Sequence, residues 1–391
     1  MSTDVLTDRQ RWLSLSAPIA GVLGVGIAFG ALIPLIALRL ERDGVETALI
    51  GLNSAMFPIA VLTIGPFLPR IIAALGTLRS MYLAIGITAA ATLLFPALPD
   101  LWVWFLLRFV IGLASAVHWV VTEAWVNMVA TDRNRGRVMG VYATVLAAGF
   151  TVGPLIIGLT GIDGWLPFAL ITVFVALSAL PLLVARDLAP PMRHKQNAGL
   201  LRLFAHAPTV MFGALAAGFT DTALFVMLPL YGLDAGFERA VTVQLLSVFI
   251  AGNLVLQIPL GWLADRTNPR AVLIGCTAAG VVGVASLPFL LAQGPLLWIM
   301  LFVWGGTTFG LYTTGLALLG RRFPAAQLAA ANTAFVMFYE IGSVTGPVAS
   351  GFAMDLIGRN GLVVTVGAAS VAFLLFSLVR AGQRRTIPPT A

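Results

Sequence analysis

The sequence of 391 residues is poor in charge, cysteine and histidine. Charged residues make up only 10% of it, whereas soluble domains carry about a quarter, so a water-facing surface of this size is excluded. The single cysteine, Cys276, cannot form an internal disulfide. Three histidines form no metal-ligand pattern, and no H-E-x-x-H, G-x-S-x-G or P-loop motif occurs. We therefore expect no metal, no cofactor, no enzyme activity and no ATP-driven pump.

Long apolar runs dominate what is present. Hydrophobic residues make up 59% of the chain, and a bilayer-spanning helix needs about 20 apolar residues. The sequence predicts an all-α membrane protein with twelve such spans, at about 13–38, 47–68, 80–98, 101–125, 138–160, 165–185, 207–231, 241–263, 271–293, 295–319, 331–354 and 361–379.

Basic residues gather on one side of these spans. If the N-terminus is inside, eighteen of the 23 Lys and Arg residues fall in inside segments. Only Arg39, Arg42, Arg239 and Arg359 fall outside, and Arg108 lies within a span. This is the positive-inside rule, and it predicts that both termini are cytoplasmic. The net charge of +7 is thus a topology signal and gives no support to nucleic-acid binding.

Two motifs occur twice, half a chain apart. Gly65–Arg70 recurs as Gly261–Arg266, and the pattern of Gly149, Gly153 and Pro154 recurs 193 residues later as Gly342, Gly346 and Pro347. A duplicated membrane bundle is typical of transporters that work by alternating access. We expect two pseudo-symmetric six-helix bundles, at 1–185 and 207–391, joined by a cytoplasmic linker at 186–206.

These motifs resemble those of the major facilitator superfamily. The segment after span 8, Gly261–Arg270, is similar to the family's G-x-x-x-D-R-x-x-x-R loop motif. Arg108, Gly112 and Ala116 in span 4 are similar to a second family motif, and the Gly–Pro pattern of span 5 to one of proton-driven antiporters. The segment Trp119–Trp125 looks like a poorly characterised group of bacterial members, which implies a bacterial inner-membrane protein. We expect it to act as a monomer.

The resemblance also implies roles for helices and residues. Spans 1, 4, 7 and 10 would line a cavity, spans 2, 5, 8 and 11 would meet at the interface, and the charge-free spans 3, 6, 9 and 12 would face lipid. In the first motif copy, Pro69 replaces the acid that helps close the cytoplasmic side, so only Asp265 retains it. The expected gating residues are Arg70, Glu123, Arg135, Arg137, Gly261, Asp265 and Arg266, and the expected hinge residues are Gly149, Gly153, Pro154, Gly342, Gly346 and Pro347.

Four charged residues interrupt the apolar spans: Arg108, Glu123, Asp221 and Glu340. Each costs about 2.5–3.5 kcal/mol at the bilayer centre, so each should face protein or water. Asp221 and Glu340 lie near the midplane by helix rise, which makes them the candidates for proton coupling; the alternative is a structural hydrogen bond between helices. Glu123 lies near the cytoplasmic surface, where it would pair with Arg70 or Arg79, or else transfer protons.

Polar and aromatic side chains on the inner helices are the candidates for substrate binding. Arg108 could hold an anionic or carbonyl group, or it could pair with an acid such as Asp221 or with helix-end carbonyls. Amphipathic rings and amides could bind a flat organic molecule, although the same side chains serve equally well as packing. The full set is Phe29, Arg108, Trp119, Asn253, Gln257, Trp304, Tyr312 and Tyr339.

The function predicted from these features is secondary active transport of a small organic molecule. The Gly–Pro motif of span 5 favours proton-coupled antiport, and hence efflux. Proton-coupled uptake of a nutrient or vitamin is the alternative, since the same acids serve either direction, and Na⁺ could replace the proton. A non-transporting sensor on the same scaffold is a further alternative, because the first motif copy lacks its acid.

Overall fold

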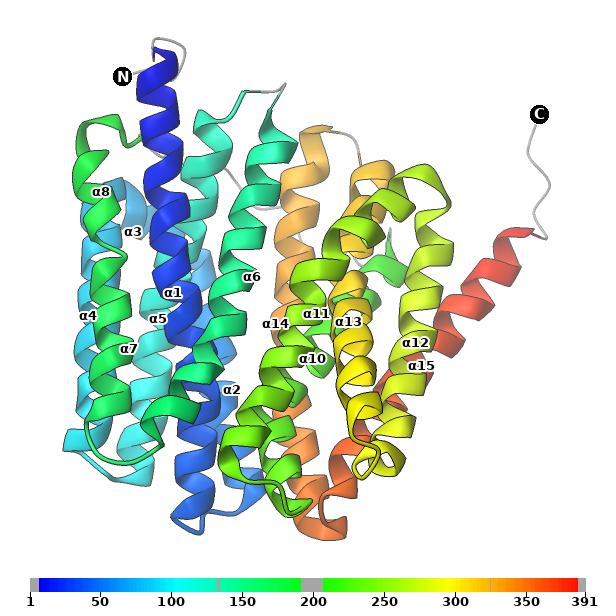
Figure 1. The fold of residues 1–391 in the computed structure, drawn as a ribbon. Helices are drawn as coiled ribbons and strands as arrows, with labels where there is room; N and C mark the ends of the chain where they lie inside the picture. The colour runs from blue at the N-terminus through cyan, green and yellow to red at the C-terminus, as the bar shows by residue number, and fades with distance from the viewer. Residues whose placement is uncertain (1–6, 132–133, 191–206, 324, 386–391) are drawn as a thin grey trace. The chain divides into compact units, whose positions relative to one another are not determined.

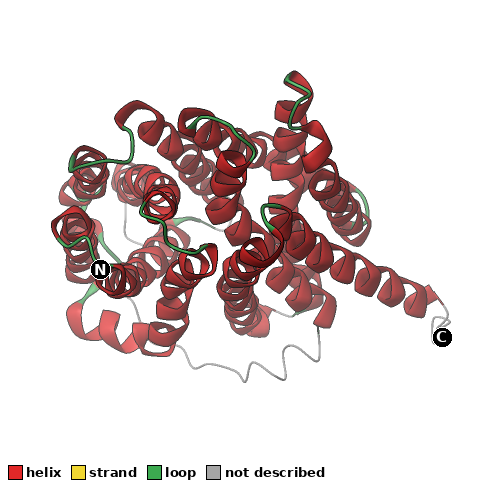
Figure 2. Cartoon of the chain, turned by 90° about the horizontal axis from the view of Figure 1, so that it is seen from below, coloured by secondary structure: helices red, strands yellow, loops and turns green. Residues whose placement is uncertain are grey.

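A computed structural model describes residues 7–131, 134–190, 207–323 and 325–385, and every regular element in these ranges is a helix (Figures 1 and 2). The first half of the chain forms α1 (Asp8–Arg42), α2 (Thr47–Ile64), α3 (Leu68–Leu75), α4 (Thr77–Ala97), α5 (Leu101–Val129), α6 (Arg135–Thr160), α7 (Leu166–Leu177) and α8 (Leu180–Val184). The second half forms α10 (Pro208–Asp234), α11 (Arg239–Arg266), α12 (Pro269–Leu290), α13 (Pro295–Arg322), α14 (Ala325–Ile357) and α15 (Asn360–Arg385).

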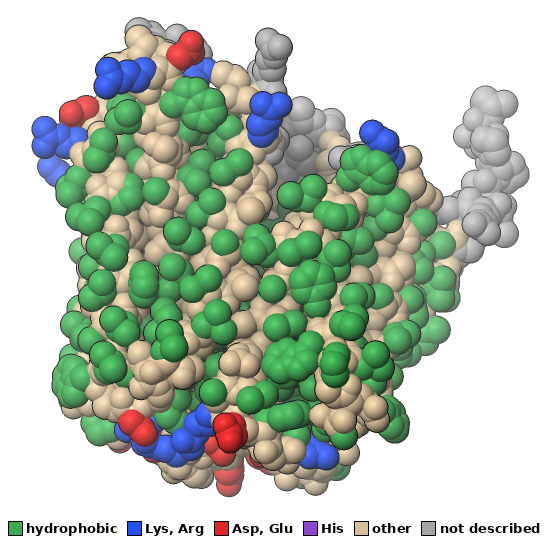
Figure 3. All heavy atoms as spheres, in the orientation of Figure 1, with side chains coloured by type: hydrophobic (Ala, Val, Ile, Leu, Met, Phe, Trp, Pro, Cys, Tyr) green, Lys and Arg blue, Asp and Glu red, His purple; other side chains and the backbone are tan. Residues whose placement is uncertain are grey.

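The predicted all-α membrane fold is confirmed. Eleven helical segments among the described residues are long and apolar enough to cross a membrane, and α14, with 33 residues, lies at the eleventh predicted span. On the face drawn in Figure 3, charged side chains gather at the two ends of the helices and hydrophobic side chains fill the stretch between them. This pattern is the one expected where hydrocarbon surrounds the middle of the helices.

The two copies of the loop motif differ in local structure. Gly65–Phe67 forms a 3₁₀ turn between α2 and α3, whereas Gly261–Arg266 is the last part of α11. Pro66 explains the difference, because a proline has no N–H to continue the helix. The second copy has Trp262 at that position, and the helix runs on through it.

Contacts between Cα atoms divide the chain into two units. The N-terminal unit comprises 1–43 and 56–196, and the C-terminal unit comprises 44–55 and 197–391. The first half of α2 therefore belongs with the second half of the sequence, which the predicted boundaries did not anticipate. Most of the predicted linker, 186–206, lies outside the described residues.

In the N-terminal unit, α1 and α6 approach so closely that only glycine fits at the crossing. A Cβ atom on Gly149 would lie 2.7 Å from the carbonyl oxygen of Leu23. A Cβ atom on Gly153 would lie 2.5 Å from that of Ile27. Small residues that let backbones touch are the usual means of helix association in membranes. The Gly–Pro pattern of the sequence thus marks a specific helix contact.

The C-terminal unit repeats this contact between α10 and α14. A Cβ atom on Gly342 would collide with the carbonyl oxygen of Leu215, and one on Gly346 with that of Phe219. Gly218 provides the reciprocal contact from α10, since its Cβ atom would collide with the carbonyl of Tyr339. Pro154 and Pro347 lie inside α6 and α14. The hinge role of these residues stays a prediction; their role at a close crossing is observed.

Polar contacts close the end of each unit at the α1–α2 and α14–α15 turns. Arg39 and Arg42 of α1 form ion pairs with Asp43 and with Asp163 of the α6–α7 connection. In the other unit, Arg359 donates to the carbonyl oxygen of Asp234 at the end of α10, at 3.1 Å. Charged side chains thus lie at helix ends in both units, as the predicted topology requires of charge outside the membrane.

Replacing Gly342 by alanine should destabilise the protein by about 1–3 kcal/mol of unfolding free energy, because the added methyl group overpacks the α10–α14 crossing. Gly275→Ala on α12 is the matched control, since nothing lies within 4 Å of a Cβ atom there. Thermal unfolding in detergent measures both. Equal melting temperatures for the two variants would contradict the close contact.

Candidate functional site

Three aromatic rings form a cluster in the N-terminal unit. The ring centroids of Phe29 on α1, Phe57 on α2 and Trp119 on α5 lie 5.4–5.6 Å apart in pairs. The indole Nε1 of Trp119 is buried and has no hydrogen-bond partner among the described residues. The cluster therefore combines three packed rings with one unused donor, and the substrate contacts predicted for Phe29 and Trp119 stay predictions.

Arg108 lies on the same helix as Trp119 and is only 3% exposed. Its Nη2 atom donates to the carbonyl oxygen of Ile33 on α1 at 3.4 Å. One turn further along α5, Gly112 packs against the backbone of Phe57. The observed partner agrees with the alternative in which the guanidinium binds helix carbonyls, so the predicted contact with a substrate stays a prediction.

The C-terminal unit has a buried acid, Asp221 on α10, which is 1% exposed. The hydroxyl of Tyr339 on α14 donates to its Oδ2 at 3.2 Å. Oδ1 has no hydrogen-bond partner among the described residues. The ring of Tyr339 lies edge-on to Tyr312 of α13, with centroids 5.4 Å apart. Asp221, Tyr339 and Tyr312, which lie on three different helices, thus form one chain of side chains.

Glu340 follows Tyr339 on α14 and is half-buried. Neither Glu340 nor Asp221 forms an ion pair with any side chain in the described ranges. A buried charge without a partner is costly, so carboxyl groups in this position are suited to exist in the neutral form. Both candidates for proton coupling therefore lie near Tyr339. Asp221 on α10 is its hydrogen-bond partner, and Glu340 is its neighbour on α14.

The other predicted side chains of this unit divide into two groups. Asn253 and Gln257, one turn apart on α11, each have a buried amide oxygen without a partner among the described residues. Trp304 is 1% exposed and packs against Phe249 and against Gly283 of α12. The two candidates on α13 therefore face different neighbours: Trp304 faces α11 and α12, and Tyr312 faces α14. Trp304 has the position of a packing side chain.

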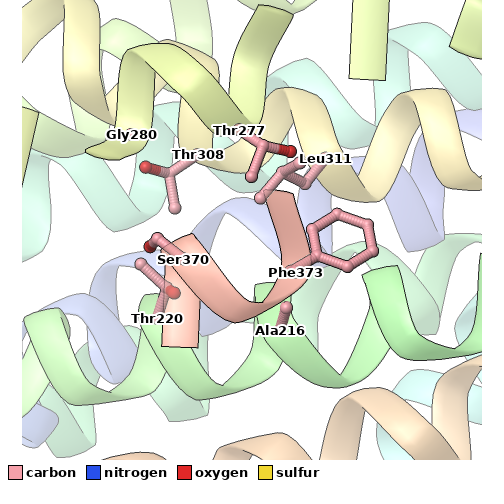
Figure 4. A pocket seen from close by; sticks show the side chains of 8 residues that line it. All are labelled: Ala216, Thr220, Thr277, Gly280, Thr308, Leu311, Ser370 and Phe373. Atoms are coloured by element: carbon pink, nitrogen blue, oxygen red, sulfur yellow. The ribbon is translucent and has the colours of Figure 1, made fainter. Parts of the chain in front are cut away.

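A small cavity of about 10 Å³ lies inside the C-terminal unit (Figure 4). Four hydroxyl groups line it, from Thr220, Thr277, Thr308 and Ser370 on four different helices. Those of Thr277 and Thr308 donate to carbonyls of their own helices. The space suits one water molecule, and no charged side chain lines it. The cavity is too small for an organic substrate.

The first turn of α2 is capped by a residue from the opposite half of the sequence. The carboxylate of Asp355 on α14 accepts the backbone N–H of Thr47 at 2.9 Å and that of Ala48 at 2.8 Å. Further along α2, a Cβ atom on Gly51 would collide with the carbonyl of Pro347, and one on Gly351 would collide with that of Thr47. A carboxylate at a helix N-terminus is stabilised by the orphan N–H groups and by the helix dipole.

The predicted gating residues are only partly visible. Arg70 on α3, Glu123 on α5 and Arg137 on α6 are exposed. Glu123 forms no ion pair with Arg70 or Arg79 within the described part of the chain, so that predicted latch is not formed in this structure. Other gating residues are described as follows: Gly261 lies in open space, Arg266 stacks on Trp262 at 4.4 Å, and the side chains of Arg135 and Asp265 lie outside the described residues.

The Major Facilitator Superfamily sequence profile matches residues 19–347 and 211–391 of the chain. This chain belongs to the major facilitator superfamily. Its similarity to curated superfamily members extends over nearly its whole length. The uncharacterized MFS-type transporter YfkF of Bacillus subtilis (strain 168) is 28% identical over 88% of this chain and 90% of its own. The uncharacterized MFS-type transporter Ent638_1421 of Enterobacter sp. (strain 638) is 28% identical over 94% and 96%.

Solved structures share the superfamily fold at lower identity. A crystal structure of a mutant form of the nucleoside transporter NupG aligns with a TM-score of 0.77 and 15% identity, over 94% of this chain and 99% of that one. A bacterial homologue of the human lysosomal transporter Spinster aligns with a TM-score of 0.70 and 14% identity, over 96% of both chains. The protein is thus a multi-pass membrane transporter of this superfamily and not an enzyme.

Two residues that make important contacts, Phe57 and Asp355, were not predicted from the sequence. Phe57 completes the aromatic cluster, but one phenylalanine among 24 carries no signal of its own. Asp355 lies one residue beyond the predicted span 11 and was not among the predicted site residues. A signal was available, because Gly351 and Asp355 lie one turn apart, next to the duplicated Gly–Pro motif.

Asp355→Asn should loosen the contact between α2 and α14, because an amide offers one acceptor oxygen where the carboxylate offers two. Loss of a helix cap costs about 1 kcal/mol, which is roughly a fivefold change in an equilibrium. A cysteine in place of Ala55, which is 1% exposed and four residues after Gly51, should then react about fivefold faster with a water-soluble maleimide.

The control for this measurement is Glu238→Gln, an exposed acid at the start of α11 whose side chain makes no cap hydrogen bond. It should leave the reaction rate of the Ala55→Cys thiol unchanged. Equal rates in the Asp355→Asn and Glu238→Gln backgrounds would show that the cap does not hold α2 to α14.

Proposed function

We propose that this chain is a proton-coupled secondary transporter that exports a small organic molecule across the bacterial inner membrane in exchange for protons. The observation that carries the proposal is the buried carboxyl group of Asp221 at the α10–α14 crossing, with the half-buried Glu340 next to its partner Tyr339 on α14. Asp221 has one hydrogen-bond partner, the hydroxyl of Tyr339, and an open Oδ1 atom among the described residues. A carboxyl group held in this way can exist with or without its proton.

An ionisable side chain inside a membrane is by default a candidate for a functional role. A permanently ionised acid at mid-bilayer depth is expensive. A structural hydrogen bond between helices is the alternative role for these acids, and the variants below separate the two roles. Among the described side chains neither Asp221 nor Glu340 has a cation partner. Both acids lie on helices that meet through glycine contacts, so proton uptake and helix movement have the same location. The same acids could bind Na⁺ in place of the proton. Replacing the pH gradient by a Na⁺ gradient in the flux experiment below distinguishes the two coupling ions.

The substrate class follows from the side chains that lack partners. The Phe29–Phe57–Trp119 cluster offers ring faces and one indole donor. Asn253 and Gln257 offer buried amide oxygens. The rings and the indole donor of the N-terminal unit suit a flat organic molecule with a hydrogen-bonding group at its edge, and Arg108 of the same unit would favour an anion or a carbonyl.

Proton-coupled uptake is the second candidate, because the same acids could serve either direction of transport. Counterflow in proteoliposomes separates the candidates: an outward proton-coupled exchange indicates export, accumulation with protons indicates uptake, and binding without exchange indicates a sensor.

The proposed topology has both termini in the cytoplasm. The arginine bias of the sequence supports it, and the Arg39–Arg42–Asp163 cluster lies at the end predicted to be outside. In this orientation the Asp355 cap closes the outer end of the C-terminal unit. In this topology the predicted gating residues Arg135, Arg137, Asp265 and Arg266 would lie on the cytoplasmic side.

Asp221→Asn and Glu340→Gln should each abolish pH-driven transport, because neither amide can carry a proton. Asp234→Asn, at the exposed end of the same helix α10, is the matched control and should retain it. The assay is flux, in proteoliposomes with an imposed pH gradient, of a compound selected by thermal shift from nucleosides, vitamins and planar dyes. Wild-type coupling in both the Asp221 and the Glu340 variants would reject the proposed proton sites.

A further inference from the structure

We propose that Tyr339 is a positioning residue which ties the proton on Asp221 to the crossing of α10 and α14. The inference deepens the proposed function and rests on it, since it assumes that Asp221 carries the coupled proton. It assigns to Tyr339 a role other than the substrate contact that its sequence pattern suggested.

The first observation is the hydrogen bond itself. The Tyr339 hydroxyl lies 3.2 Å from Oδ2 of Asp221. Hydrogen bonds between a hydroxyl and an oxygen usually have lengths of about 2.5–3.0 Å, so this bond is already long, and a further separation of α10 and α14 by about 1 Å breaks it. This is the one hydrogen bond that the Asp221 carboxyl group makes with the described part of the chain.

The second observation is where the bond lies. Gly218 precedes Asp221 by three residues, and its Cβ position is filled by the carbonyl of Tyr339. Gly342 follows Tyr339 by three residues, and its Cβ position is filled by the carbonyl of Leu215. The hydrogen bond thus spans a backbone contact that glycine makes from both sides. The two helices cannot move closer, so any change at this crossing is a slide or a separation, and either one alters the bond.

The third observation is the lack of a competing cation. The arginines of α11 and α13 lie near the helix ends, at Arg239, Arg266 and Arg322. None of the described Lys, Arg or His side chains forms an ion pair with Asp221. The other titratable groups near the bond are Tyr312 from α13, which packs on the Tyr339 ring, and Glu340, its neighbour on α14. Tyr339 is therefore the group whose position most directly follows the charge on Asp221.

The consequence follows from the strength of the bond in the two states. A hydroxyl donates a stronger and shorter hydrogen bond to an ionised carboxylate than to a neutral acid. Loss of the proton from Asp221 therefore stabilises the α10–α14 contact at its present spacing, and uptake of the proton makes a slide or separation of the two helices easier. By linkage, a conformation that separates the two helices removes the donor and favours the protonated acid. Tyr339 thereby converts a proton on one helix into a change in the contact between two.

Tyr339→Phe tests this role, because phenylalanine keeps the ring that packs on Tyr312 and removes only the donor. The readout is the infrared carboxylic-acid band of Asp221 during a pH titration of the full-length protein in liposomes, identified as the band that Asp221→Asn removes. The midpoint of that band should move to higher pH in Tyr339→Phe, by roughly half a unit to one unit.

A second readout addresses the helix crossing. In the wild type, amide deuterium uptake of residues 215–222 and 339–346 should be slower at alkaline pH than at acidic pH, because the hydrogen bond is stronger at alkaline pH. The comparison is made after correction for the intrinsic effect of pH on exchange. In Tyr339→Phe this pH dependence should disappear. Tyr231→Phe is the matched control: Tyr231 is a buried tyrosine on the same helix as Asp221, and its hydroxyl has no partner among the described residues, so both readouts should remain as in the wild type.

The outcomes separate the inference from the proposed function. If Asp221→Asn removes no titrating band, Asp221 is not the proton carrier and the proposed function fails there. If the band is present and Tyr339→Phe shows the wild-type midpoint and deuterium uptake, Asp221 remains the carrier and only the role of Tyr339 is overturned. A shift that Tyr231→Phe reproduces would also overturn it, because any lost buried hydroxyl would then suffice.

Discussion

Close backbone contact between helices is the constraint on which the rest of this structure depends. In a bilayer there is little hydrophobic gain when two apolar helices meet, so association relies on packing and on hydrogen bonds between helices. The α1–α6 and α10–α14 pairs achieve it with glycines whose missing side chains are filled by the carbonyls of the partner helix. The same device, produced twice by one repeated sequence motif, sets the geometry of both units.

Buried polar groups are arranged around these crossings. In the C-terminal unit, Asp221 and Tyr339 face each other across the α10–α14 contact. In the N-terminal unit, α1 brings Phe29 to the rings of Phe57 and Trp119, and it offers the Ile33 carbonyl to Arg108. A polar side chain inside a membrane costs several kcal/mol unless it has a partner. The partners found here come from the neighbouring helix, so stability and helix position are linked.

The two units also differ in a way that suits a transporter. The N-terminal unit has the Phe29–Phe57–Trp119 cluster and the buried Arg108. The C-terminal unit has Asp221 hydrogen-bonded to Tyr339, whose ring packs on Tyr312. The two units therefore share their helix crossings and the glycines at them, but they differ in the buried polar and aromatic side chains around those crossings. The start of α2, capped by Asp355 of α14, shows that one helix of the first repeat has its first turns held by the second.

The sequence by itself determined the fold class, the approximate spans and the pairs of residues at the glycine crossings. Length, apolar runs and motif spacing are local properties, and a bilayer permits few structures other than helices. It also located Asp221 and Glu340, since an acid in an apolar run is visible without any structure.

Only the tertiary structure decided which side chains meet. Helical periodicity puts Trp304 and Tyr312 within about 80° of each other on α13, yet Trp304 packs against α12 and Tyr312 against α14. Tyr339 was one of several candidate aromatic residues, and only the packing of α14 on α10 shows that its hydroxyl reaches Asp221. The sequence alone does not pair Asp355 with the first turn of α2, which it caps. In each case the deciding contact joins different helices, and helical periodicity reports which residues share a face but gives no information on which helix covers it.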